Sequence, residues 1–412
     1  MPPPSSRHPA RTSALIAALA LSAALSSCSG TSGPPRSDPA PATPPVAPSQ
    51  TRATPSAVAK VHHAGPALHR TNAWLAAMRQ RRIEAQNPLA GRPWGVYGGD
   101  GEMAWAPYVR AGGETRELLG KIALAPKAKW FGGWISDAAI ADKVRGYIAS
   151  AQQQAGSADA LVQMSVFRMH PWEDEACHRL PTAAESASYR TWIERFASAV
   201  GDAHAAIILQ PDGPFALCAP HGSHTPSDLI AFAARTLSAL PHASVYIDVG
   251  AADWPIESQG GVAAATRIAI QDGVRYARGI ALNTTHYSST VDEVQRGADV
   301  VRALAAQGIR DKHFVVNTSS NGKGFVFGDY RGPDPDNARV CESQQDPGPC
   351  VALGIPPTYD FDDPAWGLPR HTVELAQRYA DAFLWIGRPW LYDQKEPFVL
   401  SRALTLARVS RW

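Results

Sequence analysis

Six carboxylate or amide side chains each lie at or just beyond the end of a short apolar run, and the carboxylates among them could do acid-base chemistry. They are Asp174, Asp212, Asp248, Asn283, Asn317 and Asp393. If the runs are parallel strands of a barrel, their carboxyl ends meet at the face where active sites are built. Several acids at one face suggest acid-base chemistry on a neutral substrate. The alternative for any single aspartate is that it only caps the following helix.

Strands and helices alternate from about residue 120 onward, and these elements must position the six side chains. The strands are expected over residues 129–132, 162–167, 206–210, 244–248, 279–283, 313–317 and 382–386. The helices are expected over residues 137–154, 186–200, 227–240, 290–306 and 370–379, where apolar residues recur every three or four positions. Such alternation predicts parallel βαβ units, and about seven of them predict a distorted α/β barrel of the TIM-barrel type. A further helix is expected over residues 67–86 and should pack outside the barrel.

The first 60 residues have the composition of an export signal followed by a linker. Residues 1–28 combine a basic start with an apolar run and end in Leu25-Ser26-Ser27-Cys28, which resembles a bacterial lipobox. Cys28 is then the lipidated first residue of the mature protein; an ordinary signal peptide is the alternative. Residues 29–60 are rich in Pro, Ala, Ser and Thr, which predicts an extended spacer. We expect an exported, cell-surface or periplasmic lipoprotein whose globular domain spans residues 61–412.

The composition excludes several classes of protein. The net charge is +2 and no run of Lys or Arg occurs, which argues against a nucleic-acid binder. No apolar stretch reaches the roughly 18 residues of a spanning helix, so membrane attachment is expected through the lipid alone. No metal site or other cofactor is expected, and the protein should be a monomer. Beside Cys28 the chain has four cysteines, which allow three disulfide pairings in an oxidising compartment.

Eight segments together resemble glycoside hydrolase family 6, the cellulases that cut β-1,4-glucan with inversion. The segments are 87–91 (NPLAG), 128–130 (AKW), 171–174 (PWED), 207–213 (IILQPDG), 245–250 (VYIDVG, with Trp254 after it), 283–287 (NTTHY), 317–322 (NTSSNG) and 381–386 (DAFLWI, leading to Asp393). No single segment is decisive. Their order and spacing over about 300 residues are the specific signal.

The resemblance implies which residues carry the chemistry. Inversion needs a carboxylic acid that protonates the leaving oxygen and a base that activates water on the opposite face. Asp212 matches the general acid, Asp393 the proposed base, and Asp248 a third carboxylate of the site. Asp174 matches the residue that raises the pKa of the acid and helps to hold the water.

The resemblance also implies binding residues and disulfides. Sugar rings have flat apolar faces, so aromatic rings bind them well; Trp130 and Trp254 match two such platforms. The remaining implied substrate-binding residues are Asn283, Tyr287 and Trp385. Cys177 and Cys218 fit the family's first bridge, which leaves Cys341 to pair with Cys350.

Five positions depart from the family pattern. They are Gln210 for Glu, His286 for Asn, Asn317 for Asp, Ser320 for Arg and Gly387 for Lys. These changes put fine specificity in doubt more than reaction type, because all four carboxylate positions are retained. A non-catalytic glycan-binding lipoprotein and an exo-acting cellobiohydrolase remain alternatives. A serine esterase is disfavoured, because the chain has no GxSxG motif. The loop at residues 324–354 favours an open cleft and endo action on cellulose or a related β-glucan.

Overall fold

The computed structural model describes residues 86–99 and 101–412, all within one structural unit, Ala64–Trp412. Cys28, the linker and all but the last residue of the helix expected at 67–86 lie outside the described residues. No described helix is long and apolar enough to cross a lipid bilayer.

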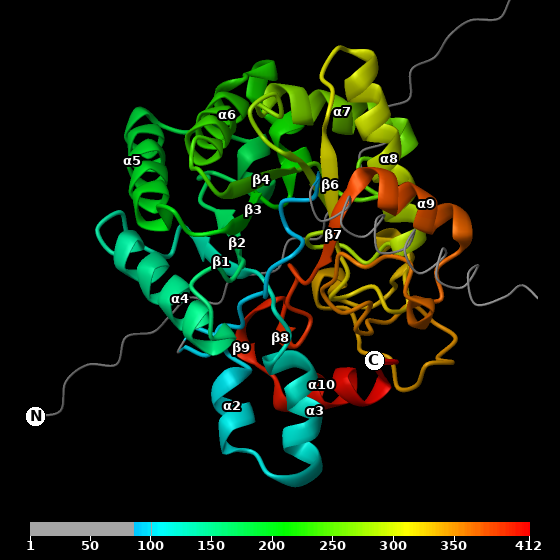
Figure 1. Cartoon of the computed structure of the whole chain (residues 1–412). Coiled ribbons are helices and arrows are strands. Elements are labelled where there is room, and N and C mark those ends of the chain that lie inside the picture. The colour runs from blue at the N-terminus through cyan, green and yellow to red at the C-terminus, as the bar shows by residue number, and fades with distance from the viewer. Residues whose placement is uncertain (1–85, 100) are drawn as a thin grey trace, which may run out of the picture. The chain divides into compact units, whose positions relative to one another are not determined.

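Seven parallel strands form one sheet in which neighbours in sequence are neighbours in space (Figure 1). They are β1 Lys129–Gly132, β2 Val162–Phe167, β3 Ala205–Leu209, β4 Ala243–Asp248, β5 Gly279–Leu282, β6 His313–Asn317 and β7 Ala380–Leu384. The two edges meet through a single parallel bridge between Lys127 and Trp385, where Ala128 N donates to Trp385 O at 2.8 Å. The predicted distorted α/β barrel is therefore confirmed. One bridge replaces a full ladder between β7 and β1.

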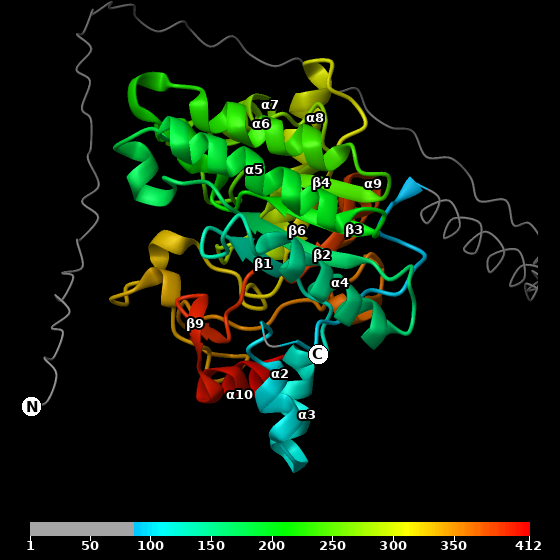
Figure 2. The ribbon, with the colours of Figure 1, turned by 90° about the vertical axis from the view of Figure 1, so that its left-hand side faces the viewer.

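Six helices cover the outside of the sheet, and each packs against the next in sequence (Figures 1 and 2). They are α4 Ile140–Ala155, α5 Ala183–Val200, α6 Thr225–Ser238, α7 Gly261–Gln271, α8 Thr290–Ala306 and α9 Arg370–Tyr379. A second group has α2 Trp105–Arg110, α3 Gly113–Ala123 and α10 Leu400–Val409, together with a short hairpin of β8 Leu391–Tyr392 and β9 Lys395–Phe398. α3 and α10 pack on each other and share an apolar core with Trp385, which follows β7.

The strands are buried on both faces, as expected for a sheet covered by helices. Side chains alternate along each strand. In β3, Ile207 packs with the surrounding helices, whereas Ile208 packs with Tyr246 and Leu384 inside the barrel. Both isoleucines are fully buried, and each such burial contributes about 1.5–3 kcal/mol.

Asp381 joins four strands near the amino end of the barrel. Its carboxylate accepts a hydrogen bond from Tyr246 Oη at 2.6 Å and from Arg278 Nε at 2.8 Å, and His313 Nδ1 lies 3.2 Å away. Burial alone would raise the pKa of Asp381, but Arg278 and His313 outweigh burial and the pKa is lowered. Residues on or next to β4, β5, β6 and β7 are thus tied to one carboxylate.

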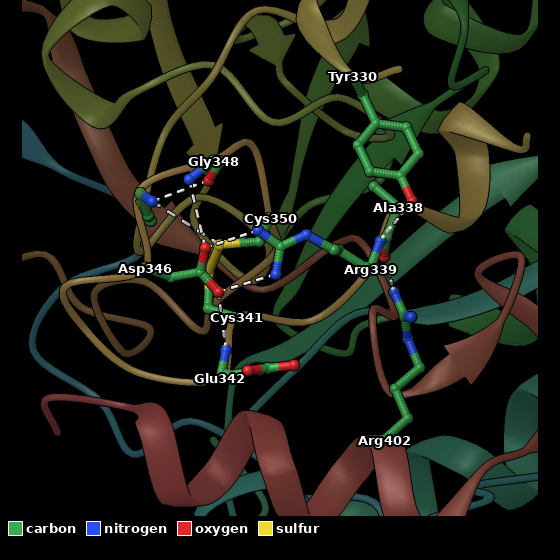
Figure 3. Close-up of a disulfide and its surroundings, with 10 residues drawn as sticks. Tyr330, Ala338, Arg339, Cys341, Glu342, Asp346, Gly348, Cys350 and Arg402 are labelled. Carbon is green, nitrogen blue, oxygen red and sulfur yellow. Dashed lines mark hydrogen bonds and ion pairs between the residues drawn. A yellow bond between two sulfur atoms is a disulfide. The ribbon is translucent and has the colours of Figure 1, made fainter. Parts of the chain in front are cut away.

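The loop between β6 and α9 is braced by the Cys341–Cys350 disulfide (Figure 3), which confirms the predicted pairing. Beside the disulfide, the guanidinium of Arg339 makes two hydrogen bonds to the carboxylate of Asp346, at 2.6 and 2.8 Å. Arg402 of α10 donates to Ala338 O at 2.7 Å. The same loop carries Asp334 and Asp336, which lie near the site described next.

Candidate active site

Asp212 follows β3 in a left-handed backbone conformation, with φ 63° and ψ 36°. Gln210, two residues earlier, is also left-handed, with φ 53°. Neighbouring loops hold this turn: Met169 N donates to Gln210 Oε1 at 3.1 Å, and Trp172 Nε1 donates to Pro211 O at 2.8 Å. The turn directs the carboxyl group of Asp212 toward the residues that follow β5.

The environment of Asp212 suits a general acid. Burial raises the pKa of Asp212 to about 6, and the charges of Glu173 and Asp336 add to this increase. A hydrogen bond from Thr285 Oγ1 to Asp212 Oδ1, at 2.7 Å, and the charge of His286 act in the opposite direction. Asp212 therefore carries its proton in weakly acidic solution and can still release it.

Asp248, at the end of β4, is 1% exposed and fixes the turn of Asp212 by binding the residue that follows it, Gly213. Its Oδ1 accepts from Gly213 N at 2.9 Å and from Gly250 N at 3.0 Å, and its Oδ2 accepts from Thr284 Oγ1 at 2.7 Å. Position 213 must be glycine, because a Cβ there would lie 2.0 Å from Asp248 O. Burial, with the charge of Asp212, raises the pKa of Asp248 to about 7 despite these hydrogen bonds.

The loop after β5, residues 283–288, connects the parts of the site. Successive side chains bind different neighbours: Thr284 binds Asp248, Thr285 binds Asp212, His286 binds Asp253, and Tyr287 Oη donates to Pro335 O and Asp336 O. Asn283, with φ 63°, closes the loop on itself by donating to Ser288 O and accepting from Ser288 N. Asn283 and Tyr287 are both buried, so in this structure they support the loop.

Asp393 lies in the same neighbourhood as Asp212. The adjacent Gln394 donates from Nε2 to Thr285 O at 2.9 Å, and Asp393 pairs with Lys395 Nζ at 2.5 Å. Carboxylate oxygens of Asp334, Asp336 and Asp393 lie within 4.8 Å of one another and could hold a cation. Acidic groups also gather at exposed positions without an ion, so this cluster does not identify a metal site.

Asp174 is placed differently from the other predicted acids. Its side chain is 89% exposed and lies 3.4 Å from His178 Nε2. In the loop after β2, the charge that helps to raise the pKa of Asp212 belongs to Glu173, the residue before Asp174. The predicted Cys177–Cys218 disulfide is confirmed, and it joins this loop to the loop that follows Asp212.

Trp130 and Trp385 are packed rather than open in this structure. Trp130 is 8% exposed and donates from Nε1 to Ile386 O at 2.7 Å, while the guanidinium of Arg388 lies 4.6 Å from its ring centroid. Trp385 is 2% exposed and donates to Ile355 O at 2.9 Å.

Two other tryptophans are more accessible. Trp254 is half-buried, with the ring of His286 stacked on it at 5.2 Å. Trp134, just beyond β1, is 61% exposed and lies outside the sequence motifs that resemble the family. The signal that marks it is an aromatic residue directly after Gly132-Gly133 at a strand end.

Three of the departures from the family pattern fit each other. Asn317 Oδ1 accepts from the backbone N–H of Ser319, Ile386 and Gly387, and its Nδ2 donates to Asn283 O at 2.8 Å. An aspartate could not make that last bond. A Cβ on Gly387 would lie 2.8 Å from Gln394 Oε1 and 2.9 Å from Ser319 Oγ, so a larger residue here would require these side chains to move. Ser320 Oγ donates to His286 O at 3.0 Å, which supports the loop after β5.

The family model described as Glycosyl hydrolases family 6 matches residues 102–393. Endoglucanase 1 of Streptomyces halstedii is 29% identical over 227 residues, which are 53% of this chain and 66% of that protein. Endoglucanase A of Cellulomonas fimi is 31% identical over 229 residues, covering 54% of this chain and 45% of that protein. These matches span less than two thirds of either relative.

Solved structures match a larger share of the chain. The endoglucanase Cel6 from Mycobacterium tuberculosis, in complex with methyl-cellobiosyl-4-deoxy-4-thio-β-D-cellobioside, superposes with a TM-score of 0.58 at 28% identity, covering 78% of this chain and 98% of that chain. The catalytic core domain of the cellobiohydrolase Cel6A from Chaetomium thermophilum gives a TM-score of 0.56 at 17% identity, covering 79% and 98% of the two chains. The second similarity concerns the fold alone.

Proposed function

The chain belongs to glycosyl hydrolases family 6, and from this premise we propose that it hydrolyses internal β-1,4-glucosidic bonds of cellulose or a related β-glucan with inversion. The observation that carries the proposal is Asp212, a shielded carboxyl group with a pKa of about 6 in the turn after β3, within the residues matched by the family model. The names of the curated relatives, both endoglucanases, support action on a β-glucan and favour endo over exo attack.

In the proposed reaction Asp212 donates its proton to the leaving oxygen as the bond to the anomeric carbon breaks. General acids work best when their pKa lies near the operating pH. Asp248 holds Gly213 N–H and so keeps Asp212 in place, without facing solvent itself. Thr285, through its hydrogen bond to Oδ1, stabilises the carboxylate that remains.

The attacking water needs a base on the opposite side of the sugar ring. We assign this role to Asp393, whose Oδ2 forms an ion pair with Lys395 Nζ at 2.5 Å. From its position in the family motif we propose that Asp174 helps to hold the water; its side chain is exposed in this structure. The raised pKa of Asp212 is attributed mainly to burial.

We further propose that substrate rests on Trp254, which lies beside the loop that carries Thr285. Trp134 is proposed as a second contact because of its exposure. The protein is proposed to be exported and anchored through lipidated Cys28. The two disulfides support export, because disulfides persist in oxidising compartments.

The test is product analysis of purified protein on carboxymethylcellulose and on cello-oligosaccharides. We expect a rapid fall in viscosity with few reducing ends released, which indicates internal cleavage. NMR should detect the α-anomer as the first product from a β-linked chain. A first product in the β-configuration, or no hydrolysis of any β-glucan, would overturn the proposal.

A further inference from the structure

The ring of His286 is held between two aromatic side chains. Trp254 stacks on it with a centroid distance of 5.2 Å and an interplanar angle of 3°, and Phe327 stacks on it at 4.7 Å and 22°. Nδ1 of His286 lies 2.9 Å from Oδ1 of Asp253. The His286 side chain is 13% exposed and that of Asp253 is 6% exposed. Aromatic faces and a shielded carboxylate both favour the protonated imidazole.

Asp253 is itself fixed, because its second oxygen accepts a hydrogen bond from Phe327 N at 2.7 Å. The other charged groups around the pair are mostly acidic. Asp212 and Asp336 act on His286, and Glu293 lies behind Asp253. Burial raises the pKa of Glu293 well above its usual value, and Ala252 N donates a hydrogen bond to Glu293 Oε1. The positively charged residue beside Glu293 is Arg296, which donates to Ala252 O.

His286 is also linked to Asp212 by sequence and by charge. It directly follows Thr285, which donates to Asp212 Oδ1 at 2.7 Å. Burial alone would lower the pKa of His286, but Asp253 outweighs burial, and the charge of Asp212 adds to the increase. In return, the charge of His286 lowers the pKa of Asp212.

We propose that the imidazolium of His286, held by Asp253 between two aromatic rings, is a positioning residue that stabilises the Asp212 carboxylate left after proton donation. This inference rests on the proposed role of Asp212 as general acid. In the step concerned, the proton of Asp212 moves to the glycosidic oxygen and the bond to the anomeric carbon breaks. His286 keeps its proton throughout and supplies a fixed positive charge where negative charge develops.

The first test is NMR titration of the His286 ring, which needs no enzymatic activity. We expect His286 in the wild-type protein to titrate above the ordinary 6.5. Asp253→Asn should lower that value strongly, and Asp212→Asn should lower it by a smaller amount. A wild-type His286 that titrates at or below 6.5, or that does not respond to Asp212→Asn, would contradict the inference.

The second test is the pH dependence of hydrolysis in His286→Asn, which places the family's residue at this position. Without the cation, Asp212 holds its proton more tightly, so the alkaline limb should move to higher pH. At pH values below the alkaline limb, the rate on unactivated glucan should fall by at most about tenfold for each unit by which the pKa of the acid rises, and KM should change little. A substrate with a good leaving group should be affected less.

His313→Asn is the matched control, because His313 also lies beside a carboxylate, 3.2 Å from Asp381 near the amino end of the barrel. It should leave the pH profile unchanged. If His286→Asn lowers activity equally at every pH, its role is structural and the inference is wrong. A wild-type protein without activity would refute the proposed function, and the NMR titration would still decide on the Asp253–His286 pair.

Discussion

Two left-handed residues, Gln210 and Asp212, lie on either side of Pro211. For residues other than glycine such conformations cost of order 1–3 kcal/mol each, and they persist where the surroundings hold them. Here Met169 N–H and the indole of Trp172 bind the turn from the loop after β2. Position 210 differs from the family's glutamate, yet the glutamine retains the oxygen that accepts from Met169. The departure therefore preserves the geometry of the acid.

Asp212→Asn should separate the binding of substrate from its cleavage. The amide keeps the shape of the side chain but has no acidic proton, so hydrolysis of unactivated glucan should fall by about 10²–10⁴, the usual contribution of general acid catalysis. A substrate with a good leaving group needs little protonation and should lose far less. Steady-state kinetics on both substrates, with binding measured by calorimetry, would check this. Equal losses on both substrates would exclude Asp212 as the acid.

The wild-type rate should fall as the pH rises through the pKa of Asp212, near 6. The sign follows from the role: a general acid works in its protonated form, which is lost above its pKa. A pH profile of kcat on cello-oligosaccharides would show this alkaline limb. A rate that stays constant well above pH 7 would mean that another group donates the proton.

Asp248→Ala and Asp248→Asn should behave differently. The alanine variant leaves the buried N–H of Gly213 without its acceptor, which costs about 1–3 kcal/mol. It should lower both thermal stability and kcat, because the turn of Asp212 loses its support. The asparagine variant keeps an oxygen for Gly213 and Gly250 and should retain most of the stability. If both variants retain full activity, Asp248 does not position the acid.

At the scale of elements, Asp381 connects four strands of the barrel, and its contribution to the stability of the protein should depend on pH. The pKa of Asp381 is lowered in the folded state, so its contribution to stability is present above the unfolded value of about 3.8 and is lost as the pH falls through the lowered folded value. Asp381→Asn should cost about 3 kcal/mol near neutral pH, because it breaks a buried ion pair with Arg278.

Urea unfolding of the wild-type protein and Asp381→Asn at pH 7 and pH 3 would measure this contribution. The difference between the two proteins should shrink at the lower pH. Asp142→Asn, which removes an exposed pair with Arg145, serves as the control and should change stability by less than about 0.5 kcal/mol. A difference for Asp381→Asn that is the same at both pH values would contradict the lowered pKa.

The Cys177–Cys218 disulfide joins the loops after β2 and β3, and its two cysteines are 41 positions apart in the sequence. Replacing both cysteines by alanine should destabilise the protein by about 2–4 kcal/mol. It should also lower kcat, because these loops hold Asp212. Non-reducing peptide mapping of the exported protein should find these two cysteines linked. Linkage of either one to Cys341 or Cys350 would be inconsistent with the structure.

The sequence predicted the strands well, because the β-rich runs between helical stretches are short and apolar. β1, β2 and β6 begin and end at the expected residues, and α8 and α9 do as well. It missed α7, whose sequence GVAAATRIAIQ is dominated by small and apolar residues and shows little polar face. It also missed α2, α3 and α10, which pack apart from the alternating units.

Within the site, the positions of residues at or just after strand ends could be predicted from the sequence. The positions of residues further out in the loops could not. Asp212 and Asp248 lie together as expected, because Asp212 follows β3 and Asp248 ends the neighbouring strand β4. The loop carrying Asp174 has two residues more than the family motif before its cysteine, and Asp174 points to solvent. The Asp253–His286 pair could not be read from the sequence, because the two residues belong to loops 33 positions apart that only the fold brings together.

At the scale of the whole chain, the catalytic domain is proposed to work at a distance from a membrane. Residues 29–60 are rich in Pro, Ala, Ser and Thr, a composition that predicts a spacer between Cys28 and the catalytic domain. Such a spacer would let the domain meet a polymeric glucan while the lipid at Cys28 keeps the enzyme on the cell.

Cys28→Ser should therefore release the protein from the membrane fraction without altering its activity on soluble glucan, because the change lies far from the acid at position 212. Cell fractionation followed by an activity assay on carboxymethylcellulose would measure both effects, and mass spectrometry of the wild-type amino terminus should find a lipidated cysteine. Two acyl chains hold a protein stably on a bilayer, whereas removing them leaves no comparable apolar anchor. A wild-type protein that is unmodified and found free of the membrane would refute the anchor and leave an ordinary signal peptide as the explanation of residues 1–28.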